Sequence, residues 1–365
     1  MNIPLVDLGR QYAEVESLIT AGWSNVIDHS SYILGPEVAE FERAFAEFCQ
    51  VSQCVGVGNG TDALELALRA LGIGPGDEVI LPANTFVATA LAPIRAGISI
   101  RLVDCDPGTY LIDTEQVAAA VGPRTKAIMP VHLFGQMAPV EELARQHPDL
   151  FIVEDAAQSQ GASRYGRRAG SVGHVAGTSF YPGKNLGAFG DAGAVMTNDV
   201  DVADRVRTLR NWGSDRKYHH PVAGFNSRLD TLQAVVLSAK LTRLVDWNHQ
   251  RRAAAVYYDS LLSGYEQVTL PTTLPGNEHV YHLYVVEVDD RDRVLADLQH
   301  AGIGAGVHYP VPIHLQGALA NLGHKAGDFP HSEAAASRML SLPMFPGLQT
   351  VEQDRVAEVL SASLT

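Results

Sequence analysis

Cysteines and long apolar runs are scarce in this sequence of 365 residues. The three cysteines, Cys49, Cys54 and Cys105, include no CxxC pair, which argues against a cysteine zinc site and against a disulfide framework. We expect all three to pack in the core. No stretch reaches the roughly 18 apolar residues of a membrane span. The opening MNIPLVDLGRQYAEVE carries acids and lacks the apolar core of a signal peptide, so a cytoplasmic location is expected.

Positive charge is also in short supply, because 27 Lys and Arg stand against 41 Asp and Glu, a net charge of −14. Nucleic acids and anionic membranes are captured by clustered Lys and Arg, so neither is expected as a partner. A small anionic ligand in a local pocket is still compatible with this charge. The length suits a large domain joined to a smaller one.

Short apolar runs alternate with helical patterns in the first two thirds of the chain. QCVGVG, DEVILP, ISIRLVD, TKAIMPVHLF and LFIVED are typical of buried strands. Between or before them lie the helical patterns PEVAEFERAFAEFC, TDALELALRAL, TEQVAAAV and PVEELARQH. This alternation predicts a mainly parallel sheet that is covered by helices on both faces.

The pattern changes after about residue 225. A long helical stretch, RLDTLQAVVLSAKLTRLVDWNHQRRAAAVYYDSLL, predicts two helices or one bent helix. The strand-like HLYVVEV, the helical RDRVLADLQHAG and a closing helix from Val351 follow. We therefore predict a large ligand-binding domain over residues 1–245 and a small C-terminal α+β domain over residues 246–365.

Three segments follow strands, and ligands bind beyond the carboxyl ends of the strands in open parallel sheets. The first, VGVGNGTDAL, opens a helix at Gly60 and Thr61, where free N–H groups and a hydroxyl would attract phosphate. An ordinary N-cap with glycines for packing is the alternative. A Rossmann interpretation is weak, because the spacing is G-x-G-x-G and no acid clearly marks a ribose.

The second segment, FIVEDAAQSQGA, ends a strand at Glu154 and Asp155. A carboxylate at this edge is costly to bury without a partner, and a cationic ring nitrogen would supply one. A capping or ion-paired acid is the alternative. A metal site would need more ligands of the right type than this neighbourhood offers.

The third segment, SFYPGKNLGAFGDAG, places Lys184 among four glycines. It fails the P-loop pattern, because Asn185 follows the lysine where Ser or Thr is required. A lysine in a dry pocket has a lowered pKa and can form a Schiff base with a carbonyl, while Ser179 could bind phosphate. A solvated loop lysine is the alternative. Together the three segments match the phosphate, ring nitrogen and aldehyde of pyridoxal phosphate (PLP).

The same motifs resemble those of the DegT/DnrJ/EryC1/StrS family of PLP-dependent sugar aminotransferases. The resemblance runs almost end to end, through IPLVDLGRQY, YILGPEVAEFE, GNGTDALELALRALGIGPGDEVILPANTFVATA, VEDAAQSQGA, SFYPGKNLGAFGDAGAV, GFNSRLDTLQA and VHYPVPIHLQ. It implies an α/β fold of the aspartate aminotransferase (PLP type I) class. In that fold, a mainly parallel seven-stranded sheet is flanked by helices, and residues 1–245 would bind PLP.

The resemblance implies a role for each matching residue. Lys184 would form the Schiff base and later carry the proton, Asp155 would pair with the ring nitrogen, and Gln158 would bond the ring hydroxyl. Phe86 would stack on the ring, although core packing is the alternative for a single phenylalanine. The phosphate would contact Gly60, Thr61, Ser179 and, from the second subunit of a homodimer, Asn226.

The implied reaction has two halves. Glutamate or glutamine would leave its amino group as pyridoxamine phosphate, and a nucleotide-linked ketosugar would then receive it. Lys184 fits this reaction, because dehydratase relatives carry histidine at the matching position. The motifs are most similar to members acting at sugar C3, which make dTDP-3-amino-3,6-dideoxyhexoses. The expected sugar contacts, each histidine with a structural or solvated role as its alternative, are Tyr181, Tyr218, His219, His220, His308, Tyr309 and His314.

Two other functions compete with this interpretation. A family member could act on a C4-ketosugar or an inosose, or the chain could be a non-catalytic regulator that only binds ligand. The intact Lys184, Asp155 and Gln158 argue against the regulator. No arginine can be assigned from sequence to the nucleotide diphosphate or to the donor carboxylate.

Overall fold

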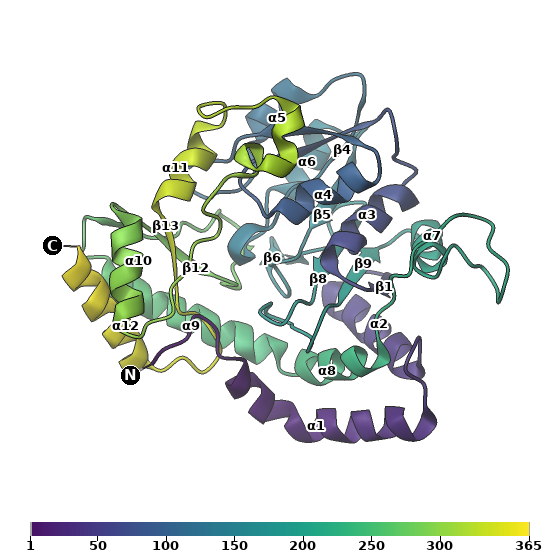
Figure 1. Ribbon diagram of the computed structural model, residues 1–365, viewed down its shortest axis with the longest axis horizontal. Helices are drawn as coiled ribbons and strands as arrows, with labels where there is room; N and C mark the ends of the chain where they lie inside the picture. Colours follow the sequence, from purple (N-terminus) through teal and green to yellow (C-terminus); the bar gives the residue numbers. More distant parts are fainter. Residues whose placement is uncertain (1, 365) are drawn as a thin grey trace.

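A computed structural model describes residues 2–364 and shows a central sheet of seven strands (Figure 1). Their order is β1-β9-β8-β5-β4-β2-β3. The pairs among β2, β3, β4, β5 and β8 are parallel, whereas β9 runs antiparallel to both β1 and β8. The predicted mainly parallel sheet is therefore confirmed. The strands are β1 (Gln53–Val57), β2 (Glu78–Pro82), β3 (Ser99–Val103), β4 (Thr125–Ile128), β5 (Phe151–Asp155), β8 (Val175–Ser179) and β9 (Gly193–Thr197).

Five of these strands match predicted apolar runs, but β8 and β9 were not predicted. Their sequences, VAGTS and GAVMT, are rich in small residues and lack a bulky apolar run. Packing explains one of these small residues, since a Cβ on Gly177 would come within 2.7 Å of the Leu64 side chain. The small residues of β8 thus let a helix lie directly on the sheet.

Helices cover both faces of the sheet, as predicted. One face packs on α3 (Gly60–Ala70), α4 (Val87–Arg95) and α7 (Val200–Arg210). The other packs on α2 (Pro36–Cys49), α8 (Thr231–Leu241), α5 (Thr114–Ala120) and α6 (Val140–Gln146). Outside these layers, α1 (Leu8–His29) runs along α8 (Figure 1).

The long helical stretch is two helices, α8 and then α9 (Leu244–Leu262). Beyond α9, a second core surrounds the three-stranded sheet β10-β12-β13. Ile3 belongs to this second core and pairs with Ile303. The other elements of this second core are β10 (Val268–Thr269), β12 (Tyr284–Val288), α10 (Arg291–His300), β13 (Met339–Leu342) and α12 (Thr350–Ser363). The helix α11 (Pro330–Arg338) instead packs through Ala335 in the cluster that contains α5 and α6.

The remaining elements are short. A small sheet of order β11-β6-β7 and three 3-10 turns complete the described chain. No helix within residues 2–364 is long and apolar enough to cross a membrane. These short elements are β6 (Ser163–Arg164), β7 (Arg167–Arg168), β11 (Asn277–Glu278), η1 (Leu133–Gly135), η2 (Ile313–Leu315) and η3 (Gly317–Leu322).

Candidate active site

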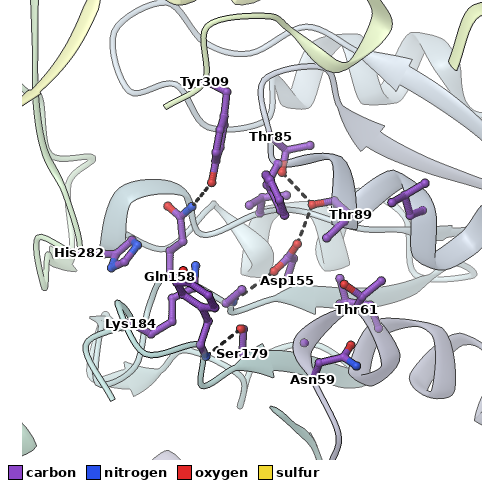
Figure 2. A pocket seen from close by; sticks show the side chains of 18 of the residues that line it. Asn59, Thr61, Thr85, Thr89, Asp155, Gln158, Ser179, Lys184, His282 and Tyr309 are labelled. Atoms are coloured by element: carbon purple, nitrogen blue, oxygen red, sulfur yellow. Dashed lines mark hydrogen bonds between the residues drawn. The ribbon is translucent and has the colours of Figure 1, made fainter. Parts of the chain in front are cut away.

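A cavity of about 640 Å³ lies at the carboxyl ends of β2, β4, β5 and β8 (Figure 2). This is where the topology of a parallel sheet favours a ligand, and the volume suits a small organic molecule. The three segments singled out in the sequence all contribute to its wall. The predicted residues that line it are Gly60, Thr61, Phe86, Asp155, Gln158, Ser179, Tyr181, Lys184, His308 and Tyr309.

Lys184 follows β8 in a tight loop. The loop is closed by a 2.8 Å hydrogen bond from the Lys184 N–H to the Tyr181 carbonyl, and a Cβ on Gly187 would collide with the Pro182 carbonyl. Burial lowers the pKa of Lys184 to about 8, and the nearby Asp155 carboxylate opposes this shift. A substantial fraction of Lys184 is therefore a free amine at mildly alkaline pH. A free amine is the form that attacks a carbonyl carbon.

Asp155 ends β5 and is almost completely buried. Its carboxylate accepts hydrogen bonds from the Thr89 hydroxyl at 2.7 Å and from the Ala157 N–H at 3.2 Å. Burial nevertheless raises its pKa, because these bonds and the charge of Lys184 only partly offset the loss of solvent. A cationic ligand atom in the cavity would stabilise the ionised carboxylate, as a protonated ring nitrogen does.

The start of α3 forms a pocket for an anion. Asn59 caps the helix by accepting a 2.8 Å hydrogen bond from the Asp62 N–H. The N–H groups of Gly60 and Thr61 stay unpaired within residues 2–364, as expected for a first helical turn. Ser179 lies close to Gly60, since a Cβ added to Gly60 would come within 2.6 Å of the Ser179 Cβ. Two N–H groups and two hydroxyls thus meet where a phosphate would bind.

Gln158 and Phe86 lie on the wall with Tyr309. The Gln158 amide donates to the Tyr309 hydroxyl at 3.1 Å and accepts from the Phe134 N–H at 2.6 Å (Figure 2). The rings of Phe86 and Tyr309 are 5.2 Å apart between centroids. Phe86 is half exposed at the cavity instead of filling the core, so its face is available to a flat ligand.

Five predicted site residues lie outside this cavity. His314 is buried, and its Nε2 lies 3.0 Å from the Glu333 carboxylate. The other four belong to the segment between α7 and α8, which projects from the molecule beside α7 (Figure 1). In that segment Tyr218 is 86% exposed. The remaining three are His219, His220 and Asn226.

Sequence reasoning missed several residues that line the cavity. Thr89 was part of a matched motif, but its hydrogen bond to Asp155 depends on how α4 packs against β5. Arg95 is paired with Asp62 and Glu65, and its sequence context gave no sign that it lies at the cavity. The missed residues with functional side chains are Asn59, Thr85, Thr89, Arg95, Asp191 and His282.

This chain is similar to known proteins over nearly its whole length. The model of the DegT/DnrJ/EryC1/StrS aminotransferase family matches residues 14–361. The dTDP-3-amino-3,4,6-trideoxy-alpha-D-glucose transaminase of Streptomyces venezuelae is 45% identical over 98% of this chain and 95% of its own length. A pleiotropic regulatory protein of Geobacillus stearothermophilus is 45% identical over 99% of this chain and 98% of its own length. The crystal structure of S. venezuelae DesV has a TM-score of 0.96 at 44% identity, covering 100% and 99% of the two chains.

The matches extend over nearly the whole chain and include both named transaminases and solved aminotransferase structures. PLP is the cofactor of these enzymes, and the cavity offers each group that PLP requires. Those groups are donors for the phosphate, a carboxylate for the ring nitrogen and an amine for the aldehyde. The chain therefore belongs to the DegT/DnrJ/EryC1/StrS aminotransferase family and is a PLP-dependent sugar aminotransferase.

Proposed function

We propose that this enzyme transfers an amino group from glutamate or glutamine to C3 of a dTDP-linked 3-keto-6-deoxyhexose. The observation that carries the proposal is the meeting of Lys184 and Asp155 in one cavity at the carboxyl edge of the sheet. The choice of C3 rests on the S. venezuelae transaminase, whose named product carries its amino group at C3. An aminotransferase that resembles it over nearly the whole chain is expected to share the carbon that it aminates.

The residues of the cavity would have separate roles in cofactor binding and proton transfer. PLP, when bound, draws electrons from the carbon that carries the transferred nitrogen. Gly60, Thr61 and Ser179 would hold its phosphate, and Asp155 would keep the ring nitrogen protonated. The Lys184 Nζ would take a proton from one carbon and return it to another, because an amine with a pKa of about 8 can do both near neutral pH.

The sugar would enter over the open side of the cavity. Tyr181 is 59% exposed at the rim. Burial lowers the pKa of His308 to about 4, so its imidazole would be neutral and able to bond sugar hydroxyls. We assign Tyr181, His308 and Tyr309 to the sugar on these grounds.

A homodimer would complete the site. The segment between α7 and α8 carries Asn226 and the exposed Tyr218, neither of which lines the cavity of its own subunit. This segment projects from the molecule beside α7 (Figure 1). We propose that this segment reaches the second subunit, where Asn226 would contact the phosphate. Tyr218, His219 and His220 would then face the partner's sugar.

A panel of ketosugars tests the proposal. The purified protein is incubated with glutamate or with glutamine and, in turn, a C3-ketosugar, a C4-ketosugar and an inosose. The aminated product is identified by mass spectrometry and NMR. We expect product from the dTDP-linked 3-keto-6-deoxyhexose. Product from a C4-ketosugar or an inosose alone would show instead that the enzyme is a C4-ketosugar or inosose aminotransferase of the same family. A protein that binds PLP but transfers nothing from any donor would favour the regulator.

A further inference from the structure

Asn185, the residue after Lys184, is completely enclosed and joins three separate segments. Its side-chain amide donates to the Val280 carbonyl at 3.0 Å and to the Asn248 side chain at 2.9 Å. Its other side-chain atom lies 3.2 Å from the Nδ1 of His282. This arrangement ties the lysine loop to α9 and to the segment that leads into β12.

The Val280 carbonyl fixes which way the Asn185 amide faces. A backbone carbonyl can only accept a hydrogen, so the NH₂ group of Asn185 must face Val280. The oxygen of Asn185 must therefore face His282, and an oxygen of this kind can only accept. It follows that the Nδ1 of His282 carries a hydrogen and donates it to Asn185.

His282 is held in place from its backbone side as well. The buried Arg251 donates to the carbonyls of Tyr281 and Met344, each at 3.0 Å, and to that of His282 at 3.4 Å. Burial, together with the positive charge of Lys184, holds the pKa of His282 well below its usual range. The ring is thus neutral near pH 7, and a neutral imidazole with hydrogen on Nδ1 has a bare Nε2.

The bare Nε2 has no hydrogen-bond partner among residues 2–364, although His282 is only 9% exposed. This nitrogen is not one of the fully enclosed unpaired atoms of the described chain, so it keeps accessible surface through which a partner can approach. His282 lines the cavity on the same side as Lys184 and Gln158 (Figure 2). The atom that satisfies its Nε2 can therefore come from a ligand in the cavity.

We propose that His282 contacts the substrate, with its Nε2 accepting a hydrogen from a hydroxyl or amino group beside Lys184. This inference rests on the proposed function, since it takes the cavity to be the substrate site. A lone pair repels carboxylate, phosphate and carbonyl oxygens, which also carry lone pairs. His282 would therefore select hydrogen-bond donors at this position and exclude acceptors. The hydroxyl would come from the sugar, and the amino group from the amino-acid donor.

Two substitutions of His282 test the roles of its two ring nitrogens separately. His282→Asn retains an amide nitrogen near the place of Nδ1, and so the bond to Asn185, but has no atom at the place of Nε2. His282→Gln extends an acceptor to that place. We expect the asparagine variant to raise KM by about three- to tenfold if it loses a hydroxyl, or more than tenfold if it loses a charged amine. The glutamine variant should recover most of this loss.

Measuring the two half-reactions separately identifies the source of the hydrogen. A raised KM for the amino acid alone assigns His282 to the donor amine, and a raised KM for the ketosugar alone assigns it to a sugar hydroxyl. Circular dichroism melting confirms that both variants are folded. Unchanged KM values in both half-reactions of a folded asparagine variant would overturn the proposal.

A second measurement needs no variant activity. In protein labelled with ¹⁵N-histidine, the His282 resonances are those lost in the asparagine variant. Between pH 6 and 8 we expect Nδ1 to be protonated and Nε2 to be unprotonated. A protonated Nε2 at neutral pH would overturn the proposal. This readout is independent of turnover, so a wild-type protein without transaminase activity would refute the proposed function and leave the tautomer measurable.

Discussion

Two lysines of this chain share a lowered pKa, and their surroundings give them different roles. Burial lowers the pKa of Lys184 and that of Lys240 to about 8. Lys184 lines the cavity, whereas Lys240 donates to the Gly187 carbonyl at 2.7 Å and lies over the Phe189 ring. Lys240 therefore braces the loop that presents Lys184. Access to the cavity, and not the pKa alone, singles out Lys184 for chemistry.

The lowered pKa of Lys184 predicts how cofactor loading depends on pH. Because the folded protein disfavours the ammonium form, the free amine becomes the major form as pH rises through about 8. We expect the rate at which cofactor-free protein develops a visible absorbance band with PLP to rise with pH and to level off above 8. Lys184→Ala should develop no band. A rate that is still rising steeply near pH 10 would contradict the lowered pKa.

The hydroxyl chain that ends on Asp155 supports a second prediction. Thr89 donates to Asp155, which can only accept, so Thr85 donates to Thr89 at 2.8 Å. Thr89→Val removes a donor that favours the ionised carboxylate, so the pKa of Asp155 should rise further. A carboxyl group that is ionised less often would be less able to keep the ring nitrogen protonated. We expect about a tenfold slower half-reaction with glutamate.

Thr85→Val is the matched control for this change. It removes the outer hydrogen bond and leaves the one to Asp155 in place, so the rate should fall by less than about threefold. Equal losses in the two variants would show that general packing, and not the contact to Asp155, sets the effect.

At the scale of the residue, the sequence predicted many of the residues that line the cavity but not the residues that hold them in place. Gly60 was predicted because it opens a helix, Asp155 because it ends a strand, and Ser179 and Lys184 because they belong to one glycine-rich segment. All four line one cavity. Thr89 and His282 could not be assigned in this way. Their positions depend on packing between segments that are far apart in the chain, as does the hydrogen bond of His282 to Asn185.

At the scale of the element, the approach of α3 to the sheet makes the anion pocket. Gly193 in β9 is required for this approach, since a Cβ there would come within 2.5 Å of the Asn59 carbonyl group. Gly60 is required from the other side, where Ser179 lies. The helical pattern TDALELALRAL predicted the helix, and the free N–H groups and Thr61 at its start predicted a phosphate site. Because β8 and β9 lack bulky residues, the sequence did not reveal these two strands, on which the start of α3 packs.

Gly60→Ala tests the anion pocket. The new methyl group would push the first turn of α3 away from Ser179, so the N–H groups and the hydroxyl would no longer meet. We expect PLP to bind at least about tenfold more weakly, as followed by absorbance titration. Gly74→Ala is the control, because a Cβ there meets nothing within 4 Å. Unaltered PLP binding by a folded Gly60→Ala protein would show that α3 does not contribute to the phosphate site.

At the scale of the whole molecule, the fold places the cavity between the central sheet and the second core. His308 and Tyr309 reach the cavity from the segment between α10 and β13. The division into residues 1–245 and 246–365 stays a prediction, and Ile3 packs with the second core although it lies at the start of the chain. The chain length and the change of pattern after about residue 225 predicted two units but could not show that the first residues return to the second core.

The proposed shared site predicts complementation between two defective proteins. Asn226→Ala should weaken PLP retention, while Lys184→Ala should abolish transamination. In a mixed dimer, one cavity would combine the intact Lys184 of one subunit with the intact Asn226 of the other. We expect mixing under conditions that allow subunit exchange to restore up to about one quarter of wild-type activity, since random pairing makes half the dimers mixed. No recovery despite proven exchange would argue against the shared site.

The central claim is that Lys184 is the residue that holds PLP, and borohydride reduction tests it most directly. The purified protein is loaded with PLP, reduced and digested, and the modified peptide is identified by mass spectrometry. Lys240 is an internal control, since its pKa is lowered to the same value of about 8. We expect the pyridoxyl group on Lys184 alone. A pyridoxyl group on Lys240, or a protein that takes up no PLP, would contradict the account.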